Sequence, residues 1–392
     1  MKILFVHDFY QQFGGEDSAA IAERKLLEFN KHEVLHYSRH NDEIKSYGVW
    51  DKLAFFPRTV YSSRTVADIE KLVLDFQPQV AFVHNVYPLI SPSLYHVLHR
   101  LRIPIAQVVH DFRPHCANGW YYVHGQICER CKFGNHLHAI RNRCYKDSYL
   151  LSALYSATLS VNRNAGLLNK IDAFICLTGF YKQKMLEVGI PEHKLYIRPN
   201  FIDAATSGVP TSDGAGNYVL YLGRLSAEKG PWTVVKAFQK LRDVELRIAG
   251  TGPLEQELKK YVHDNNLTNI RFLGFQSGDA KWATINGAKF TIVPSECYEN
   301  FPMVVLEYFS RCKPVIASNL GGLPYIVEDG KNGLLYRPGE VDDLIEKVRF
   351  LIDRPADIKA MGSYGRHLVE TRYGPGESHS TLMNIFGRMV AA

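Results

Sequence analysis

The stretch that decides the fold is SECYENFPMVVLEYFSR, at residues 295–311. An apolar run at 290–293 precedes it, is typical of a buried parallel strand, and ends at Pro294. Pro302 occupies a position that helices favour, in the first turn, and residues 303–309 continue the predicted helix. A strand that leads directly into a helix is the repeating unit of an α/β fold, so this stretch predicts that class.

Two carboxylates bracket the turn, Glu299 in the loop and Glu307 in the helix. The start of a helix at the carboxyl end of a strand binds anions, because its free N–H groups and its dipole point at the ligand. An ionised carboxylate only accepts hydrogen bonds, so the glutamates suit hydroxyl groups rather than phosphates. The stretch therefore predicts a phosphate-linked, polyhydroxylated ligand, with two solvated surface glutamates as the alternative.

The same alternation of strand and helix continues through the second half of the chain. Apolar runs predict strands at 218–222, 245–249, 270–273, 290–293, 314–317 and 334–336. Helical patterns lie at 231–241, 254–264, 279–286, 341–351 and 357–372. This order indicates a parallel sheet with helices on both faces.

The first half has a similar pattern, and a stretch rich in Gly, Pro, Ser and Asp separates the two halves. Strands are predicted at 2–7, 33–37, 80–84, 105–110 and 173–177, and helices at 17–30, 66–76, 91–101 and 149–170. We predict a first domain at 1–198, a linker at 199–216, a second domain at 217–373 and a terminal segment at 374–392. Ligands of two doubly wound domains are expected at the carboxyl ends of the strands.

A second chemical feature is GRLSAEKG, at residues 223–230, directly after the first strand of the second half. Arg224 and Lys229 lie in the loop that follows the same predicted strand, and Gly230 lets the backbone turn into the next helix. A guanidinium binds phosphate bidentately and an ammonium acts as a point charge, so the two cations suit a diphosphate. An exposed charged loop is the alternative, and the nearby Glu299 and Glu307 make it less favoured.

Taken together, several motifs resemble the retaining glycosyltransferases of family four, which have the GT-B fold. They are GRLSAEKG, AGTGP at 249–253, FLGF at 272–275, the pair Glu299 and Glu307 spaced as E-x7-E, and ASNLGGLPYIVEDGKNGLLY at 317–336. The first half is similar more loosely, through Gly14-Gly15 and His110-Asp111.

The resemblance implies a role for each matching position. Arg224 and Lys229 would bind the donor diphosphate and support the departing nucleoside diphosphate, Glu299 would bind the sugar and Glu307 the ribose. His110 would lie near the anomeric carbon, which makes His110, Glu299, Arg224 and Lys229 the implied catalytic set. The remaining implied donor-binding residues are Gly14, Gly15, Gly252, Gly274, Phe275, Asn300, Phe301 and Pro302.

The chemistry of glycosyl transfer agrees with these residues. Its transition state separates a positively charged sugar from a diphosphate, whose charge Arg224, Lys229 and a helix start can neutralise. The second-half sequence shows no acidic metal cluster, so we expect catalysis that needs no metal cofactor. The loop reads Glu-Asn-Phe-Pro instead of a glycine-rich version, and we expect Pro302 to stiffen it.

A cysteine-bearing insert follows the His110-Asp111 pair, at residues 111–147. Cys116, Cys128, Cys131 and Cys144 include a C-x2-C step and are compatible with a tetrahedral structural zinc site. Free thiols are the alternative. Some relatives in the resembling family show a similar insert.

The composition of the chain indicates in which part of the cell the protein is expected. Hydrophobic residues make up 46% and charged residues 22%, as in ordinary globular proteins. The apolar run in the first residues, MKILFVHDF, is too short for a signal peptide. No apolar run in the sequence approaches the roughly 18 residues that are needed to span a membrane. We therefore expect a cytoplasmic protein, with any membrane contact peripheral, on the inner face of the cytoplasmic membrane.

The positive charge is concentrated in the first half, which carries 24 Lys and Arg against 18 Asp and Glu. This excess suggests an anionic partner, such as lipid, lipid phosphate or nucleic acid. Basic residues of the insert and an aromatic stretch at 50–61 with interspersed cations can lie in a bilayer interface or line an acceptor groove. An ordinary aromatic core segment with solvated charges is an equal alternative.

The sequence therefore predicts a two-domain enzyme that moves a hexose-type sugar from a nucleotide-diphosphate sugar. The resemblance implies a saccharide or lipid-linked acceptor, held by the first domain, in cell-surface polysaccharide or glycolipid synthesis. It also implies that the second domain binds the donor and that the terminal segment at 374–392 crosses back to the first domain. A nucleotide-sugar epimerase of the same fold is the alternative. A zinc-stabilised nucleic-acid-binding protein is less favoured, because it leaves the motifs of the second half unexplained, and no nucleic-acid partner is predicted.

Overall fold

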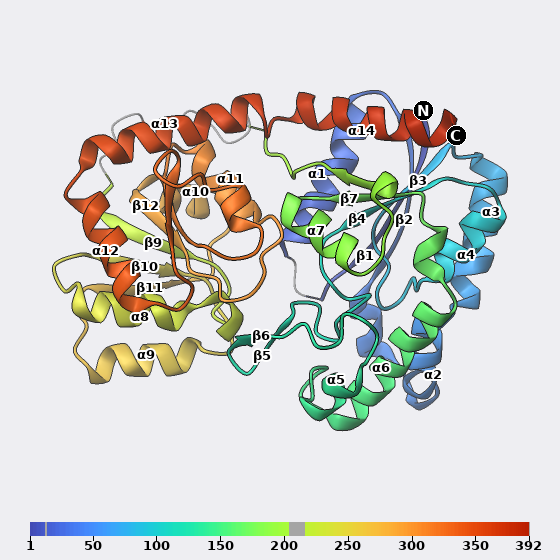
Figure 1. Ribbon diagram of the computed structural model, residues 1–392, viewed down its shortest axis with the longest axis horizontal. Coiled ribbons are helices and arrows are strands. Elements are labelled where there is room, and N and C mark those ends of the chain that lie inside the picture. The colour runs from blue at the N-terminus through green and yellow to red at the C-terminus, as the bar shows by residue number, and fades with distance from the viewer. Residues whose placement is uncertain (12–13, 204–215, 392) are drawn as a thin grey trace. The chain divides into compact units, whose positions relative to one another are not determined.

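The computed structural model describes residues 1–11, 14–203 and 216–391 (Figure 1). The chain forms two compact units, each with its own parallel sheet. The first comprises Met1–Val123, Cys128–Pro199 and Ser378–Ala392, and the second comprises His124–Ile127 and Asn200–Glu377. Most of the predicted linker at 199–216 lies outside the described residues.

The first unit contains a six-stranded sheet in the order β2-β1-β3-β4-β7-β8, with all neighbours parallel. Its inner strands are buried along nearly their whole length, as in sheets covered by helices on both faces. The strands are β1 (Lys2–Phe9), β2 (Glu33–His40), β3 (Val80–Asn85), β4 (Ile105–Val109), β7 (Ala173–Cys176) and β8 (Leu195–Ile197). A separate two-stranded sheet in the cysteine insert pairs β5 (Tyr122–Val123) with β6 (Gln126–Ile127).

Helices of the first unit begin at side chains that cap their free N–H groups. Ser62, Ser148 and Thr178 each accept a hydrogen bond from a backbone N–H three residues ahead. The helices are α1 (Gly15–Phe29), α2 (Val49–Val60), α3 (Ser63–Phe76), α4 (Ser93–Arg100), α5 (Leu137–Arg141), α6 (Tyr149–Asn164) and α7 (Gly179–Glu187). Most of α14 (Pro375–Ala391) also belongs to this unit.

The second unit contains another six-stranded parallel sheet, in the order β11-β10-β9-β12-β13-β14. Its strands are β9 (Tyr218–Leu222), β10 (Leu246–Ala249), β11 (Ile270–Gly274), β12 (Ala288–Val293), β13 (Val315–Ser318) and β14 (Gly333–Tyr336). Its helices are α8 (Pro231–Lys240), α9 (Glu255–Asp264), α10 (Gly278–Asn286), α11 (Met303–Ser310), α12 (Val341–Ile352) and α13 (Pro355–Thr371).

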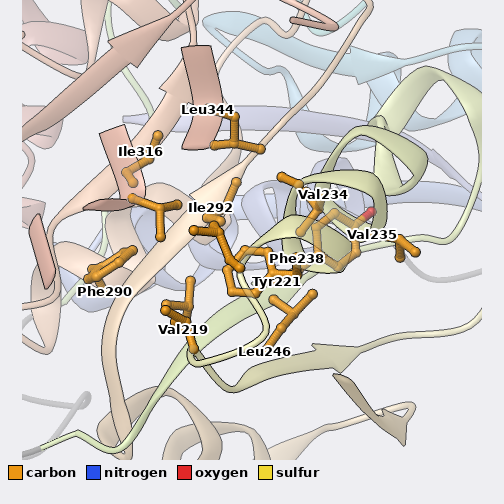
Figure 2. Close-up of a cluster of buried hydrophobic side chains, with 14 of the residues drawn as sticks. Val219, Tyr221, Val234, Val235, Phe238, Leu246, Phe290, Ile292, Ile316 and Leu344 are labelled. Carbon is orange, nitrogen blue, oxygen red and sulfur yellow. The ribbon is translucent and has the colours of Figure 1, made fainter. Parts of the chain in front are cut away.

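Figure 2 shows the core on one side of this second sheet, where alternate residues of neighbouring strands meet two helices. Tyr221 of β9 and Ile292 of β12 lie with Phe238 of α8 and Leu344 of α12, and all four side chains are almost fully buried. A period of two in the strands and of three to four in the helices produces this face. The core fixes β9 and β12 side by side at the centre of the sheet.

The predicted α/β class with two doubly wound sheets is confirmed, and some elements differ in detail. Residues 149–170 are not one helix: α6 ends at Asn164, and Gly166 has a φ of +60° before a short 3-10 turn at Leu167–Lys170. Pro302 is the residue before α11 and not part of its first turn. The sequence pattern did not predict α2, α5, α7, α14, β5, β6 and β8.

Both sheets have a point at which the strand order reverses. In the first unit β2 and β3 flank β1, and in the second β10 and β12 flank β9. Chains that leave adjacent strands there turn in opposite directions and open a crevice at the carboxyl ends, where doubly wound folds bind ligands. In the second unit this place is formed by the loops after β9 and β12.

Candidate functional site

The loops that follow β9 and β12 are tied together at the reversal point of the second sheet. The backbone N–H of Glu296 donates to the carbonyl oxygen of Glu228 over 2.9 Å. Between side chains, Lys229 Nζ donates to Glu299 Oε1 over 2.5 Å. Two residues that were predicted from separate motifs, 70 positions apart, thus form one ion pair.

Glu299 is held from two directions. Ser295 Oγ donates to the same oxygen, Oε1, over 2.6 Å. Burial would raise the pKa of Glu299, but the charge of Lys229 and its hydrogen bond lower it below the usual value. The carboxylate is therefore ionised near neutral pH and can accept hydrogen bonds from ligand hydroxyl groups.

Lys229 is charged for the complementary reason. Burial would lower its pKa, but the charge of Glu299 and the hydrogen bond between them raise the pKa above its usual value. The ammonium group has three N–H donors, and one of them is used by Glu299. Arg224, on the same loop, is exposed, and its backbone carbonyl oxygen accepts a hydrogen bond from Tyr221 Oη over 2.8 Å.

Glu307 lies on α11 and also has a lysine partner. Lys281 Nζ of α10 donates to Glu307 Oε1 over 2.7 Å, and both side chains are mostly buried. The sequence analysis missed Lys281, because it lies 26 positions from Glu307 and only the packing of α10 beside α11 brings them together. The Lys281 ammonium is also 4.9 Å from the ring centroid of Trp282.

Glycines around these loops allow close packing of backbone. A Cβ atom at Gly230, where φ is +64°, would lie 2.1 Å from the carbonyl oxygen of Pro294. A Cβ at Gly252 would lie 2.4 Å from the carbonyl oxygen of Leu225, so loop packing by itself requires this glycine. Gly274 has a φ of +68° with no atom within 4 Å, and Phe275 after it is exposed.

The segment after β13 supports the Glu299 loop from the other side. Gly322 N donates to the carbonyl oxygen of Glu299 over 2.7 Å, and a Cβ at Gly322 would lie 1.9 Å from the carbonyl oxygen of Asn300. Within the loop Phe301 is buried, with its ring centroid 5.6 Å from that of Tyr373. The motif at 317–336 thus has a structural role in positioning Glu299.

Pro302 and the start of α11 complete this edge of the site. Pro302 has no N–H and stands before the helix in extended conformation. The first N–H groups of α11 lack partners within the helix, as in every α-helix. They lie at the end of the loop that carries Glu299, and the start of a helix is a common place for an anion to bind.

The predicted residues of the first unit lie at the carboxyl ends of its strands. His110 follows β4, and its Nε2 is 2.9 Å from His84 Nδ1. Burial, with a smaller contribution from the charge of His7, lowers the pKa of His110 to about 3. His110 is therefore neutral near pH 7 and can exchange hydrogen bonds but not supply a proton as an imidazolium ion.

Gly14 and Gly15 begin α1 after β1. Gly14 N donates to Asp17 Oδ2 over 3.0 Å, and among the described residues no atom lies within 4 Å of a Cβ placed at Gly15. Gly14 has a φ of −133°, which other residues also adopt. The structure therefore shows open space at Gly15, and no backbone strain at Gly14 that would demand glycine.

The sequence analysis missed a polar cluster beside these glycines. Tyr10 Oη donates to Glu16 Oε2 over 2.7 Å, and Arg113 Nε lies 2.9 Å from Asp111 Oδ2. The Arg113 guanidinium lies 4.8 Å from the Tyr10 ring centroid, which joins the two pairs. Burial, and then the charge of Asp111, raises the pKa of Glu16. The sequence signal for this cluster was that Tyr10 and Asp111 come directly after or close after the predicted strands that became β1 and β4.

The four cysteines of the insert gather around one small cavity. Cys116 and Cys131 are buried, Cys128 and Cys144 are partly buried, and all are free thiols. The cavity is lined by these four residues and by His138 among others. Throughout residues 1–11, 14–203 and 216–391, however, no three His, Cys, Asp or Glu side chains are arranged to hold a metal ion. Structural zinc therefore stays a prediction.

Two family models match the chain, one in each half. Residues 24–206 match the family described as Glycosyltransferase Family 4, and residues 205–368 match the family described as Glycosyl transferases group 1. Both halves are therefore similar to glycosyltransferases.

Individual relatives are similar over part of the chain. An uncharacterized glycosyltransferase of Methanocaldococcus jannaschii is 31% identical over 50% of this chain and 54% of that protein. Alpha-D-kanosaminyltransferase of Streptomyces kanamyceticus is 28% identical over 43% of this chain and 45% of that protein. The matched region thus spans about half the length of these relatives.

Solved structures are similar over nearly the whole chain. Sucrose-phosphate synthase from Thermosynechococcus elongatus matches with a TM-score of 0.73 at 17% identity, and the match covers 100% of this chain and 99% of the synthase chain. The Anabaena protein HepE in complex with UDP has a TM-score of 0.67 at 17% identity, over 99% of this chain and 100% of its own. At this identity the likeness shows the fold alone, and the predicted GT-B fold is confirmed.

Proposed function

We propose that this chain, with the GT-B fold and a match to a glycosyltransferase family in each half, is a retaining glycosyltransferase. It would transfer a hexose-type sugar from a nucleoside diphosphate to a saccharide or lipid-linked acceptor, in cell-surface polysaccharide or glycolipid synthesis. The observation that carries the proposal is the charged Lys229–Glu299 pair at the reversal point of the second sheet. Such a pair offers a cation for phosphate and an acceptor for sugar hydroxyl groups in one place.

In this proposal the donor diphosphate binds to Arg224, Lys229 and the N–H groups at the start of α11. When the bond to the anomeric carbon breaks, negative charge accumulates on the diphosphate, and preorganised positive groups stabilise it. Lys229 stays in place because Glu299 holds it at 2.5 Å. These groups do the work that a divalent cation could do, so we propose catalysis without a metal cofactor.

The sugar and the ribose would bind to the two glutamates. Glu299 accepts hydrogen bonds from Lys229 and Ser295 on Oε1, so Oε2 is the oxygen that we assign to sugar hydroxyl groups. Glu307 would accept from the ribose hydroxyls and keep Lys281 as a positioning partner. The loop that carries Glu299 is held by the buried ring of Phe301 and by the hydrogen bond from Gly322 N to the Glu299 carbonyl oxygen. This fixed loop would shape the sugar site.

The first unit would hold the acceptor. His110, neutral at pH 7, would serve as a hydrogen-bonding group near the anomeric carbon, and the open space at Gly15 would admit ligand atoms. Following the family, the acceptor would attack from the face that the diphosphate leaves, and a phosphate oxygen would take its proton. Bond making and bond breaking on one face preserve the anomeric configuration.

Structural zinc on Cys116, Cys128, Cys131 and Cys144 stays part of the proposal as a fold-stabilising element with no catalytic step. The cavity that the four cysteines line supports this proposal. Among the described residues, however, these cysteines do not stand in the geometry of a metal site. Metal analysis of protein purified without a histidine tag tests this, with stoichiometric zinc as the expected result and none as the contradiction.

Transfer with retention is tested by incubating the chain with UDP-, GDP- and ADP-linked hexoses and simple alkyl glycosides as acceptors. The HepE structure was solved with UDP and glucose, so UDP-glucose is the first donor to try. Proton NMR of the anomeric signals should show release of nucleoside diphosphate and a product with the configuration of the donor. A product of opposite configuration would contradict retention, and free sugar epimerised in place of transfer would favour the epimerase alternative.

A further inference from the structure

Helix α6 has apolar residues on its outer face. Its inner face packs Tyr155 and Leu159 into a core and also buries polar residues such as Ser156. On the outer face Leu150 is 68%, Leu154 38% and Val161 49% exposed. A helix that packs on a globular core normally has charged or polar residues on its outer face.

The outward residues form a continuous stripe. Leu150, Leu154, Ala157 and Val161 are separated by four, three and four positions, which places them on one face of an α-helix. With a rise of about 1.5 Å per residue the stripe is roughly 16 Å long. Arg163 is the single charged residue among the 16 of α6, so the outer face carries none of the charges that usually make an exposed helix soluble.

Two neighbouring helices also carry exposed apolar residues. Helices α2 and α5 both pack against α6, and Figure 1 shows the three grouped together. Beneath them Ala139 of α5 and Tyr155 of α6 form a small core, against which Phe56 of α2 packs. On the outside Trp50 of α2 is 82% exposed, and Leu137 of α5 is also exposed.

Cations accompany the apolar residues. Residues 49–60 and 137–164 contain Lys52, Arg58, Arg141, Arg143, Lys146 and Arg163 against Asp51 and Asp147. Arg58 pairs with Asp51 over 2.7 Å and Arg143 with Asp147 over 3.3 Å, both at exposed positions where such pairs open readily. The segments therefore carry a net positive charge together with exposed aliphatic and aromatic side chains.

We propose that the α2–α5–α6 surface, made by the exposed residues of these three helices and of residues 142–148, docks on the anionic face of a lipid bilayer. Apolar side chains would enter the interfacial region, Trp50 and Tyr149 would lie at headgroup level, and the cations would contact lipid phosphates. None of the described helices is long and apolar enough to cross a membrane, so this contact lies along the surface.

Charge favours a bilayer over a second copy of the chain as the occupant. A two-fold contact would bring the same basic surface against itself, and like charges would oppose each other. An anionic bilayer satisfies both the apolar stripe and the cations. The inference uses only first-unit residues outside the proposed donor site, so it stands or falls separately from the proposed function.

Sedimentation with vesicles tests the inference. We expect wild-type chain to bind vesicles of equal parts phosphatidylglycerol and phosphatidylcholine, and to bind phosphatidylcholine alone weakly. Binding should fall as salt is added, because salt screens the cations. The triple variant Leu150→Gln, Leu154→Gln, Val161→Gln should bind about tenfold less or weaker, since its apolar stripe is lost. Phe29→Gln with Leu74→Gln, exposed residues of α1 and α3, is the matched control and should bind like wild type.

A second variant keeps the test informative if the triple variant misfolds. Arg141→Ser, Arg143→Ser, Lys146→Ser removes exposed charges only and should also bind about tenfold less. Wild-type binding by both variants would overturn the inference, as would wild-type chain that ignores anionic vesicles. A third outcome would assign the surface to a second copy of the chain: the wild-type protein is a dimer that does not bind vesicles, and the variant with Leu150, Leu154 and Val161 changed to glutamine is a monomer.

Discussion

Chain in which Lys229 is replaced by methionine should stay folded and lose nearly all sugar transfer. Methionine keeps most of the length and apolar contact of the lysine stem but removes the charge that faces Glu299 at 2.5 Å. In the proposal this charge stabilises the departing diphosphate, and the loss of one such group typically lowers the rate by about 10² to 10³. The measurement is the initial rate of nucleoside diphosphate release, together with the melting temperature of the variant.

Two companion variants make the result specific. Lys240→Met removes a lysine that pairs with Asp342 over 2.6 Å on the exposed surface, and it should leave the rate unchanged. Glu307→Ala should keep the fold and weaken binding of the nucleoside diphosphate, since it removes the proposed ribose acceptor. If Lys229→Met and Glu307→Ala both bind donor and react like wild type, the site assignment is wrong.

The second large effect concerns stability of the first unit. Arg198, at the end of β8, is almost fully buried and binds Glu23 of α1 through two parallel hydrogen bonds of 2.5 and 2.8 Å. It also donates to the carbonyl oxygen and to Oγ of Ser378 in α14, over 2.9 and 2.6 Å. One guanidinium thus joins a helix near the start of the chain, a strand and the last helix.

We expect Glu23→Ala to lower the free energy of unfolding of the first unit by about 3 to 5 kcal/mol, because it leaves a buried guanidinium without its counter-charge. The chain has two units, so the probe must report on one of them. Trp50 and Trp120 lie in the first unit, and Trp232 and Trp282 in the second. Urea unfolding followed by tryptophan fluorescence, in a background with both second-unit tryptophans changed to phenylalanine, gives this value.

Matched variants separate a buried charge pair from a general loss of contacts. The double variant Glu23→Leu, Arg198→Met should regain much of the stability, since neither charge is then left alone in the interior. Asp243→Ala breaks an exposed pair in which Arg349 Nη1 lies 2.5 Å from Asp243 Oδ2, and it should lower the free energy of unfolding by less than about 1 kcal/mol. A Glu23→Ala effect as small as that of Asp243→Ala would contradict the account of α14 attachment.

The strands of the sheet could be predicted closely because buried parallel strands appear in a sequence as uninterrupted apolar runs between turn residues. Residues 218–222 were predicted as a strand, and β9 spans Tyr218–Leu222. The three-residue β8 was missed because a run so short has no detectable period. Helix α2 was missed because it contains Pro57 and its aromatic residues suggested a mixed surface segment.

The site could be predicted as a set of strand ends but not as a set of contacts. Glu299 and Lys229 were assigned to one ligand, and only the strand order, with β12 beside β9, explains why they touch. Lys281 carries no sequence signal, because its role depends on packing between α10 and α11. The outward apolar face of α6 was equally hidden, since periodicity reveals a stripe but not which side the protein covers.

The central claim is that Arg224 and Lys229 hold a nucleoside diphosphate at the carboxyl ends of β9 and β12. Titration calorimetry of wild-type chain with UDP, GDP and ADP, each compared with its monophosphate, tests it most directly. The account predicts that at least one diphosphate binds about tenfold or more tightly than its monophosphate, and that Lys229→Met abolishes the difference. Equal affinity for the two, or binding of the diphosphate unaffected by Lys229→Met, would contradict it.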